Sequence, residues 1–130
     1  MNVTMITAGL LGLLLVFLSS YVIAGRSKFK VGIGDGGNVI MHRRMRAQAN
    51  FIEHVPLALI LIALIENAPI GPPWVVEALG VVLVVSRILH AQGLIASGGF
   101  SFGRFVGTGG TLLVIIAGAV LCLGRGLGAW

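Results

Sequence analysis

Charged side chains are absent from the start of this chain: the first Lys, Arg, Asp or Glu is Arg26. Residues 6–24 form an almost unbroken apolar stretch, close to the roughly 20 residues that a helix needs to span a hydrocarbon core. The stretch has no basic segment before it and no clear small-x-small cleavage site. We therefore prefer a retained transmembrane helix to the alternative, a cleaved signal peptide.

Three further apolar stretches follow, each set off by a segment that breaks helices. Residues 25–38 are rich in Gly and charge, residues 68–73 contain three of the four prolines, and residues 96–103 are rich in Gly and Ser. These breaks predict helices over about 4–25, 39–67, 73–96 and 104–124. The expected fold is an all-α integral membrane four-helix bundle, with the whole chain, 1–130, as a single domain.

The composition agrees with a membrane protein and excludes several other classes. Hydrophobic residues make up 57% of the chain and charged residues 10%, against about 45–50% and 25% in soluble domains. A chain of this size cannot cover so much apolar surface by itself, so we expect membrane lipid or other subunits as partners. Despite the net charge of +5 we expect no nucleic acid, and a single cysteine excludes a disulfide within the chain.

The basic residues predict the orientation in the membrane. Most Lys and Arg residues lie in or beside the first loop, and Arg104 borders the third loop. The positive-inside rule then puts these loops in the cytoplasm and both termini outside, on the periplasmic side of a bacterial inner membrane; only Arg125 opposes this. For five of the basic residues we prefer a role as anchors to lipid headgroups: Arg26, Lys28, Lys30, Arg43 and Arg44.

The second predicted helix carries a polar stripe. Arg43, Arg46, Asn50 and Glu53 are spaced three, four and three residues apart, which puts them on one helix face. From the helical rise, Glu53 and Arg87 both lie roughly 10 Å below the cytoplasmic interface. Because an unpaired charge at that depth is costly, we expect a contact between Glu53 and Arg87, within or between subunits.

Other polar residues fall at the same cytoplasmic level. Together with Arg46 and Asn50, the residues His90, Gln92 and Arg104 predict a basic cup for a small anion at the ends of the helices. Headgroup anchoring is the alternative.

Three weaker features point to structure instead of chemistry. Gly103, Gly107 and Thr111 form a ridge of small residues that would let the fourth helix approach another closely. The glycine-rich segment 32–37 lacks the other parts of a phosphate-binding motif and is expected to be a flexible loop. The three histidines have no metal-like spacing, so we expect no metal site.

The segment Arg46-Ala-Gln-Ala-Asn50-Phe-Ile-Glu53-His-Val-Pro56 resembles the second helix of the MAPEG proteins, the membrane-associated proteins in eicosanoid and glutathione metabolism. Their pattern there is approximately R-A-x-x-N-x-x-E-x-x-P. The resemblance covers nearly the whole chain in length and helix number and is greatest to the bacterial branch. Two later segments also match, Arg87-x-x-His90-x-Gln92-Gly93 and Arg104-Phe-Val-Gly.

The resemblance implies a homotrimer with a glutathione site at each subunit boundary, open to the cytoplasm. Glutathione would be the co-substrate, and Arg104 the catalytic residue that stabilises its thiolate. The two carboxylates and one ammonium of glutathione suit a cup with several cations and one carboxylate. The positions that would bind glutathione are Arg46, Gln48, Asn50, Glu53, His54, Arg87 and His90.

The implied activity is that of a glutathione-dependent transferase or peroxidase acting on small hydrophobic electrophiles. His54 stands where several conjugating members carry Tyr, and His90 and Leu94 stand where the leukotriene-forming branch carries tyrosines. These differences argue against leukotriene synthesis and leave the second substrate open. The alternatives are a non-catalytic scaffold that binds lipid or a partner protein, and a small multidrug transporter, which would need a carboxylate in the first helix that this chain lacks.

Overall fold

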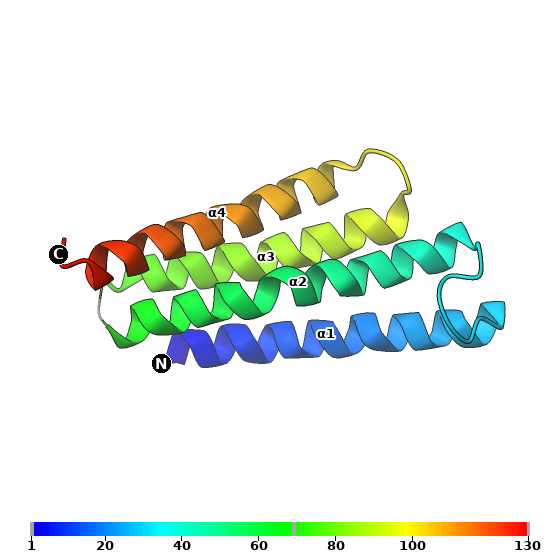
Figure 1. Cartoon of the computed structure of the whole chain (residues 1–130), viewed down its shortest axis with the longest axis horizontal. Coiled ribbons are helices and arrows are strands. Elements are labelled where there is room, and N and C mark those ends of the chain that lie inside the picture. Colours follow the sequence, from blue (N-terminus) through cyan, green and yellow to red (C-terminus); the bar gives the residue numbers. More distant parts are fainter. Residues whose placement is uncertain (1, 69, 130) are drawn as a thin grey trace.

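The computed structural model describes residues 2–68 and 70–129, and within them the chain forms four antiparallel helices and no strands (Figure 1). The helices are α1 (Asn2–Phe29), α2 (Val39–Asn67), α3 (Trp74–Ala96) and α4 (Phe102–Gly126). All four are long and apolar enough to span a membrane, so the predicted four-helix membrane bundle is confirmed. Pro69, part of the predicted break between the second and third helices, lies outside the described residues.

The helix bounds agree with the predicted ranges except at the ends. The largest difference is at α1, which continues to Phe29 and includes Arg26 and Lys28 in its last turn. Cations there interact favourably with the negative end of the helix dipole, so the charged segment extends the helix where a break was predicted. α2 runs without interruption through Pro56.

The two ends of the bundle differ in character. The start of α1 and the end of α4 lie at one end, and the connections 30–38 and 97–101 lie at the other (Figure 1). At the first end, the carboxylate of Glu66 accepts hydrogen bonds from the backbone N–H groups of Val3 (3.0 Å) and Thr4 (2.9 Å). These N–H groups belong to the first turn of α1 and have no partner within their own helix. The contact fixes the start of α1 to the end of α2.

The connection between α1 and α2 is a defined loop. The Arg26 guanidinium donates to the carbonyl oxygens of Gly32 and Gly34, each at 3.1 Å. Asp35 accepts from the Gly37 N–H (2.9 Å) and contacts the His42 ring at 2.7 Å. These hydrogen bonds, the one from Gly37 first, hold the pKa of Asp35 below its ordinary value.

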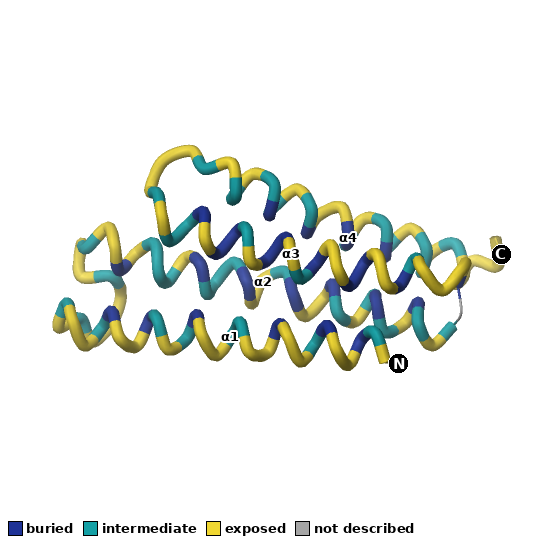
Figure 2. The backbone as a smooth tube through the Cα atoms, turned by 180° about the vertical axis from the view of Figure 1, so that it is seen from behind, coloured by how far each residue is buried: buried dark blue, intermediate teal, exposed yellow. Residues whose placement is uncertain are grey.

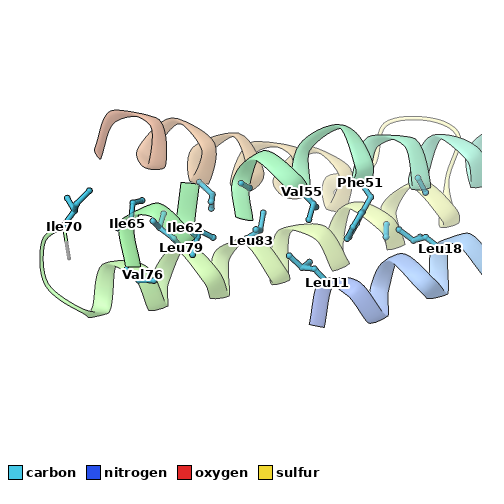
Figure 3. Packing of buried hydrophobic residues seen from close by; sticks show 14 residues of the cluster. Leu11, Leu18, Phe51, Val55, Ile62, Ile65, Ile70, Val76, Leu79 and Leu83 are labelled. Carbon is cyan, nitrogen blue, oxygen red and sulfur yellow. The ribbon is translucent and has the colours of Figure 1, made fainter. Parts of the chain in front are cut away.

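The core is apolar and lies along the inner faces of the helices. Leu11 and Leu18 of α1, Phe51 and Val55 of α2, and Leu83 of α3 contribute buried side chains to it (Figure 3). The outer faces are apolar but exposed in the single chain, as the yellow segments of Figure 2 show. Since α3 has the largest buried share of its span, 44%, it is the central helix of the bundle. The remaining apolar surface is available to lipid or to other subunits.

The predicted ridge of small residues packs α4 against α3. A Cβ atom at Gly107 would lie 2.5 Å from the Ser86 carbonyl oxygen and 2.6 Å from the His90 nitrogen, and one at Gly103 would lie 2.9 Å from the Leu89 carbonyl oxygen. These are backbone atoms, which cannot rotate away. Glycine is therefore required for the close approach of the two helices.

We predict that Gly107→Ala lowers stability by about 1–3 kcal/mol, because the added methyl group must push α4 away from α3. The measurement is the midpoint of thermal unfolding of the purified protein in detergent. Gly109→Ala is the matched control, since a Cβ there meets no atom within 4 Å. Equal midpoints for the two variants would contradict the packing described here.

Candidate functional site

A pocket of about 290 Å³ opens between α2, α3 and α4 at the end of the bundle that carries the connections 30–38 and 97–101. We call it the basic pocket. Its α2 residues lie one turn apart on a single face, its α3 residues are four positions apart, and α4 contributes from its first turn. The residues that line it are His42, Arg43, Arg46, Asn50, His90, Leu94, Gly98 and Arg104.

Four of the residues predicted from the sequence come together in this pocket: Arg46, Asn50, His90 and Arg104. They come from three helices, and the polar stripe of α2 faces a protein-lined pocket over this part of its length. Gln92, expected at the same level, is exposed and does not line the pocket.

Sequence reasoning missed two basic residues of the pocket. Arg43 was assigned to lipid headgroups, yet it lines the pocket and lies close to Gly98 of the α3–α4 connection. His42 lies one turn before Arg46 and was not considered. The signal was available in the spacing, because positions four apart on a helix share a face.

The predicted ion pair between Glu53 and Arg87 does not form within the chain. Arg87 is only 2% exposed, and one terminal nitrogen of its guanidinium donates to the Asn50 side-chain oxygen at 2.8 Å. The other donates to the backbone carbonyl of Gly107 at 3.4 Å, and Nε has no partner among the described residues. The buried cation is thus held by neutral acceptors from α2 and α4 instead of a carboxylate.

Glu53 lies at the protein surface and contacts Arg46, with 3.6 Å between the carboxylate oxygen and the guanidinium nitrogen. Its side chain is 50% exposed in the single chain. The prediction of a contact with Arg87 within the chain was wrong because Asn50, one turn earlier on the same stripe, takes that place. A contact between subunits stays a prediction. Glu53 adjoins the basic pocket through Arg46 but does not line it.

Two other predicted positions also lie outside the pocket in the single chain. The Gln48 amide donates to the Ser19 hydroxyl of α1 at 2.8 Å, on another side of α2. The His54 ring contacts the Asn50 backbone carbonyl at 2.9 Å, one turn earlier in the same helix.

Two arginines assigned to headgroup anchoring have partners within the protein. The Arg44 guanidinium lies over the Tyr21 ring, 3.7 Å from its centroid, and donates to the Tyr21 carbonyl oxygen at 2.8 Å. Together with Arg26 and its bonds to the first loop, Arg44 holds the ends of α1 and α2 together. Headgroup anchoring alone therefore does not describe Arg26 and Arg44, which also bind groups within the protein.

The basic pocket has the electrostatics of an anion site. Three arginines, two histidines and one amide supply its polar side chains, and no acidic residue is among those that line it within the described part of the chain. Guanidinium groups donate and never accept, and they suit carboxylate or phosphate oxygens. Among residues 2–68 and 70–129 no group of His, Cys, Asp and Glu side chains could hold a metal ion.

Four helices long and apolar enough to span a membrane, with a basic pocket at one end, define a small integral membrane protein. Residues 4–124 match the model of the MAPEG family. The chain belongs to this family, as the motif in α2 suggested.

The chain is also similar to two curated proteins, both called inner membrane protein YecN. One is from Escherichia coli strain K12 and the other from Escherichia coli O6:H1 strain CFT073. Each is 32% identical over 91 residues, which cover 70% of this chain and 69% of the relative. With the four apolar helices, these relatives support an integral inner membrane protein.

Because Arg87 binds Asn50 and not Glu53 within the chain, substitutions of these two residues should differ in their effect on stability. We expect Asn50→Ala to cost about 1–3 kcal/mol of stability, because it leaves a buried guanidinium donor without its acceptor. Glu53→Gln removes only a half-exposed ion pair and should cost at most about 1 kcal/mol. Thermal unfolding in detergent tests both. A larger loss for Glu53→Gln than for Asn50→Ala would restore the carboxylate as the partner of Arg87.

Proposed function

We propose that this protein is a membrane-bound, glutathione-dependent transferase or peroxidase that acts on small hydrophobic electrophiles. The observation that carries the proposal is the convergence of Arg46, Asn50 and Arg104, positions from two separate family motifs, on one basic pocket. The two carboxylates of glutathione complement the cations of this pocket.

The residues divide the binding of glutathione between them. Arg43 and Arg46 bind carboxylate oxygens, and Asn50 adds a neutral hydrogen-bonding group between α2 and α3. Glu53, held beside Arg46 at the surface, is available for the ammonium group. Gln48, His54 and His90 provide further contacts, and the first two gain access to the ligand only if a neighbouring subunit completes the site.

A homotrimer with sites at subunit boundaries would give Gln48 and His54 this access. The exposed apolar faces of the helices support such an assembly, because a neighbouring subunit would cover part of this apolar surface in place of water or lipid. Glu53 would then also lie at a boundary instead of facing acyl chains.

Arg104 is the residue that acts on the sulfur. A guanidinium next to the glutathione thiol favours the thiolate, and each unit by which the thiol pKa falls corresponds to about 1.4 kcal/mol. The proton leaves to water. In a transfer, the sulfur electron pair forms a bond to the electrophilic carbon, and the leaving group departs with the electron pair of its bond to that carbon. With a hydroperoxide, the sulfur bonds the terminal oxygen, the O–O bond breaks and the alkoxide takes a proton from water to leave as the alcohol; a second glutathione then converts the sulfenic acid to the disulfide and water.

A second pocket adjoins the same arginine and favours an apolar second substrate. It measures about 250 Å³ and is lined by Phe100, Ser101, Arg104, Phe105 and Thr108. Phe100 and Phe105 are largely exposed, at the level where α4 begins. An apolar molecule dissolved in the membrane would meet these rings before Arg104.

The alternative is a scaffold that binds lipid without turnover. It is favoured by the position of the basic pocket at the end of the bundle, where an anionic headgroup could occupy it while its acyl chains lie along the exposed helix faces. Thiolate formation distinguishes the enzyme from the scaffold, because a protein that only binds lipid does not need to ionise the thiol of glutathione.

We expect glutathione added to the solubilised protein to produce thiolate, seen as an increase in its ultraviolet absorbance, and Arg104→Ala to abolish this signal without a large loss of thermal stability. Lys28→Met, which removes a cation at the same end of the bundle and outside both pockets, is the control. Absence of thiolate in the unaltered protein would favour the scaffold.

The charge distribution generates a separate prediction about orientation. With the basic pocket and the connections 30–38 and 97–101 on the cytoplasmic side, a reporter fused after the end of α4 should be exported to the periplasm. Paired fusions of an enzyme active only in the periplasm and one active only in the cytoplasm measure this. Activity of the cytoplasmic reporter would reverse the topology and put the basic pocket on the outer side.

A further inference from the structure

We infer that Arg87 is a positioning residue, which turns the Asn50 amide so that its NH₂ group faces the basic pocket and binds a carboxylate of the ligand. The inference rests on the proposed function for the identity of the ligand, and it adds a residue that does not itself line the pocket.

The orientation of Asn50 follows from the chemistry of its partner. A guanidinium has N–H donors and no acceptor, so the atom of the Asn50 amide that Arg87 binds at 2.8 Å must be the oxygen. The oxygen and nitrogen of an amide point in different directions from the same carbon. Since the oxygen is turned to Arg87, and Asn50 also lines the pocket, the NH₂ group is the part left to face a ligand.

Arg87 is itself held so that it cannot easily give up this contact. It is 2% exposed, and its second terminal nitrogen donates to the Gly107 carbonyl oxygen of α4. α4 comes this close to α3 only because residue 107 has no side chain. Asn50 is therefore fixed by a chain of contacts that runs through all three helices that form the pocket.

The consequence is that the inner side of the pocket offers donors. Arg43, Arg46, Arg104 and the Asn50 NH₂ group all donate, and none of the residues that line the pocket within the described part of the chain is acidic. Such a surface suits a carboxylate and offers no carboxylate of its own to an ammonium group. A carboxylate of the ligand therefore binds in the pocket, and the ammonium group lies outside the pocket, toward Glu53.

Asn50→Asp tests this, because it separates the effect on folding from the effect on binding. The introduced carboxylate accepts from Arg87 at least as well as the amide does, so the thermal midpoint without ligand should be unchanged or raised. Its second oxygen faces the pocket as an anion in place of a donor. The affinity for a carboxylate ligand should therefore fall by about tenfold or more.

The probe is S-methylglutathione, which keeps both carboxylates and the ammonium group but has no thiol, and binding is measured by calorimetry and by thermal shift. The unaltered protein should bind it and should not bind glutathione diethyl ester, whose carboxylates are blocked. The matched control is Asn67→Asp, the same change at an exposed position at the other end of α2, which should bind as the unaltered protein does.

Two further variants test Arg87 itself. Arg87→Met should weaken binding of S-methylglutathione, and Arg87→Lys, which retains a cationic donor, should restore part of it. If the role of Arg87 were only structural, the two variants would lose stability without any difference in affinity between the fractions that remain folded.

The inference is overturned if Asn50→Asp binds S-methylglutathione as tightly as the unaltered protein, if it unfolds at a lower temperature without ligand, or if the unaltered protein does not bind the probe. Conjugation of glutathione to an aromatic chloride is measured separately. An unaltered protein that binds S-methylglutathione but conjugates nothing would disprove the proposed activity while the role of Arg87 stands.

Discussion

A guanidinium buried between helices, with no carboxylate in contact with it among residues 2–68 and 70–129, is the constraint on which this structure depends. Arg87 reaches neutral acceptors on two other helices, the Asn50 amide and the Gly107 carbonyl. Desolvation of a cation is costly, so these contacts restrict how α2, α3 and α4 can be arranged. The glycine at position 107 allows α4 to come close enough to take part in this arrangement. The orientation of Asn50 at the inner side of the basic pocket follows from it.

The rest of the molecule keeps the polar chemistry at one end of an apolar bundle. The spans carry few charges and present apolar side chains outward, while the arginines of the basic pocket gather at the end with the connections 30–38 and 97–101. Arg26 and Arg44 fix the ends of α1 and α2 there through backbone carbonyl groups and an aromatic ring. A pocket at the end of the bundle meets both water and the membrane, as the proposed reaction between glutathione and an apolar molecule requires.

Much of the fold and part of the site could be predicted from the sequence. The lengths of the apolar stretches and the segments that break them predicted the four helices, and the small residues of α4 predicted its close packing against another helix, which is α3. The stripe on α2 correctly brought Arg46 and Asn50 to the pocket. The predicted partner of Arg87 within the chain was wrong. Asn50 and Glu53 lie on the same stripe only about 4.5 Å apart along the helix axis, and an estimate of depth in the membrane cannot tell which of them lies level with Arg87.

The sequence by itself determined that the chain has four helices able to cross the membrane and that one of them carries a polar stripe whose spacing resembles that of the MAPEG proteins. Hydrophobic length and helical periodicity are properties of local sequence. Only the tertiary structure decided which cations share a pocket. In the sequence, His42 and Arg43 are basic residues near a helix end and cannot be told from residues that anchor a helix to lipid headgroups. Their part in the pocket depends on where α3, α4 and Gly98 lie. Helical spacing puts His42 and Arg43 on the same face of α2 as Arg46. Whether α3 and α4 lie against that face depends on how closely segments far apart in the chain approach, which no local pattern encodes.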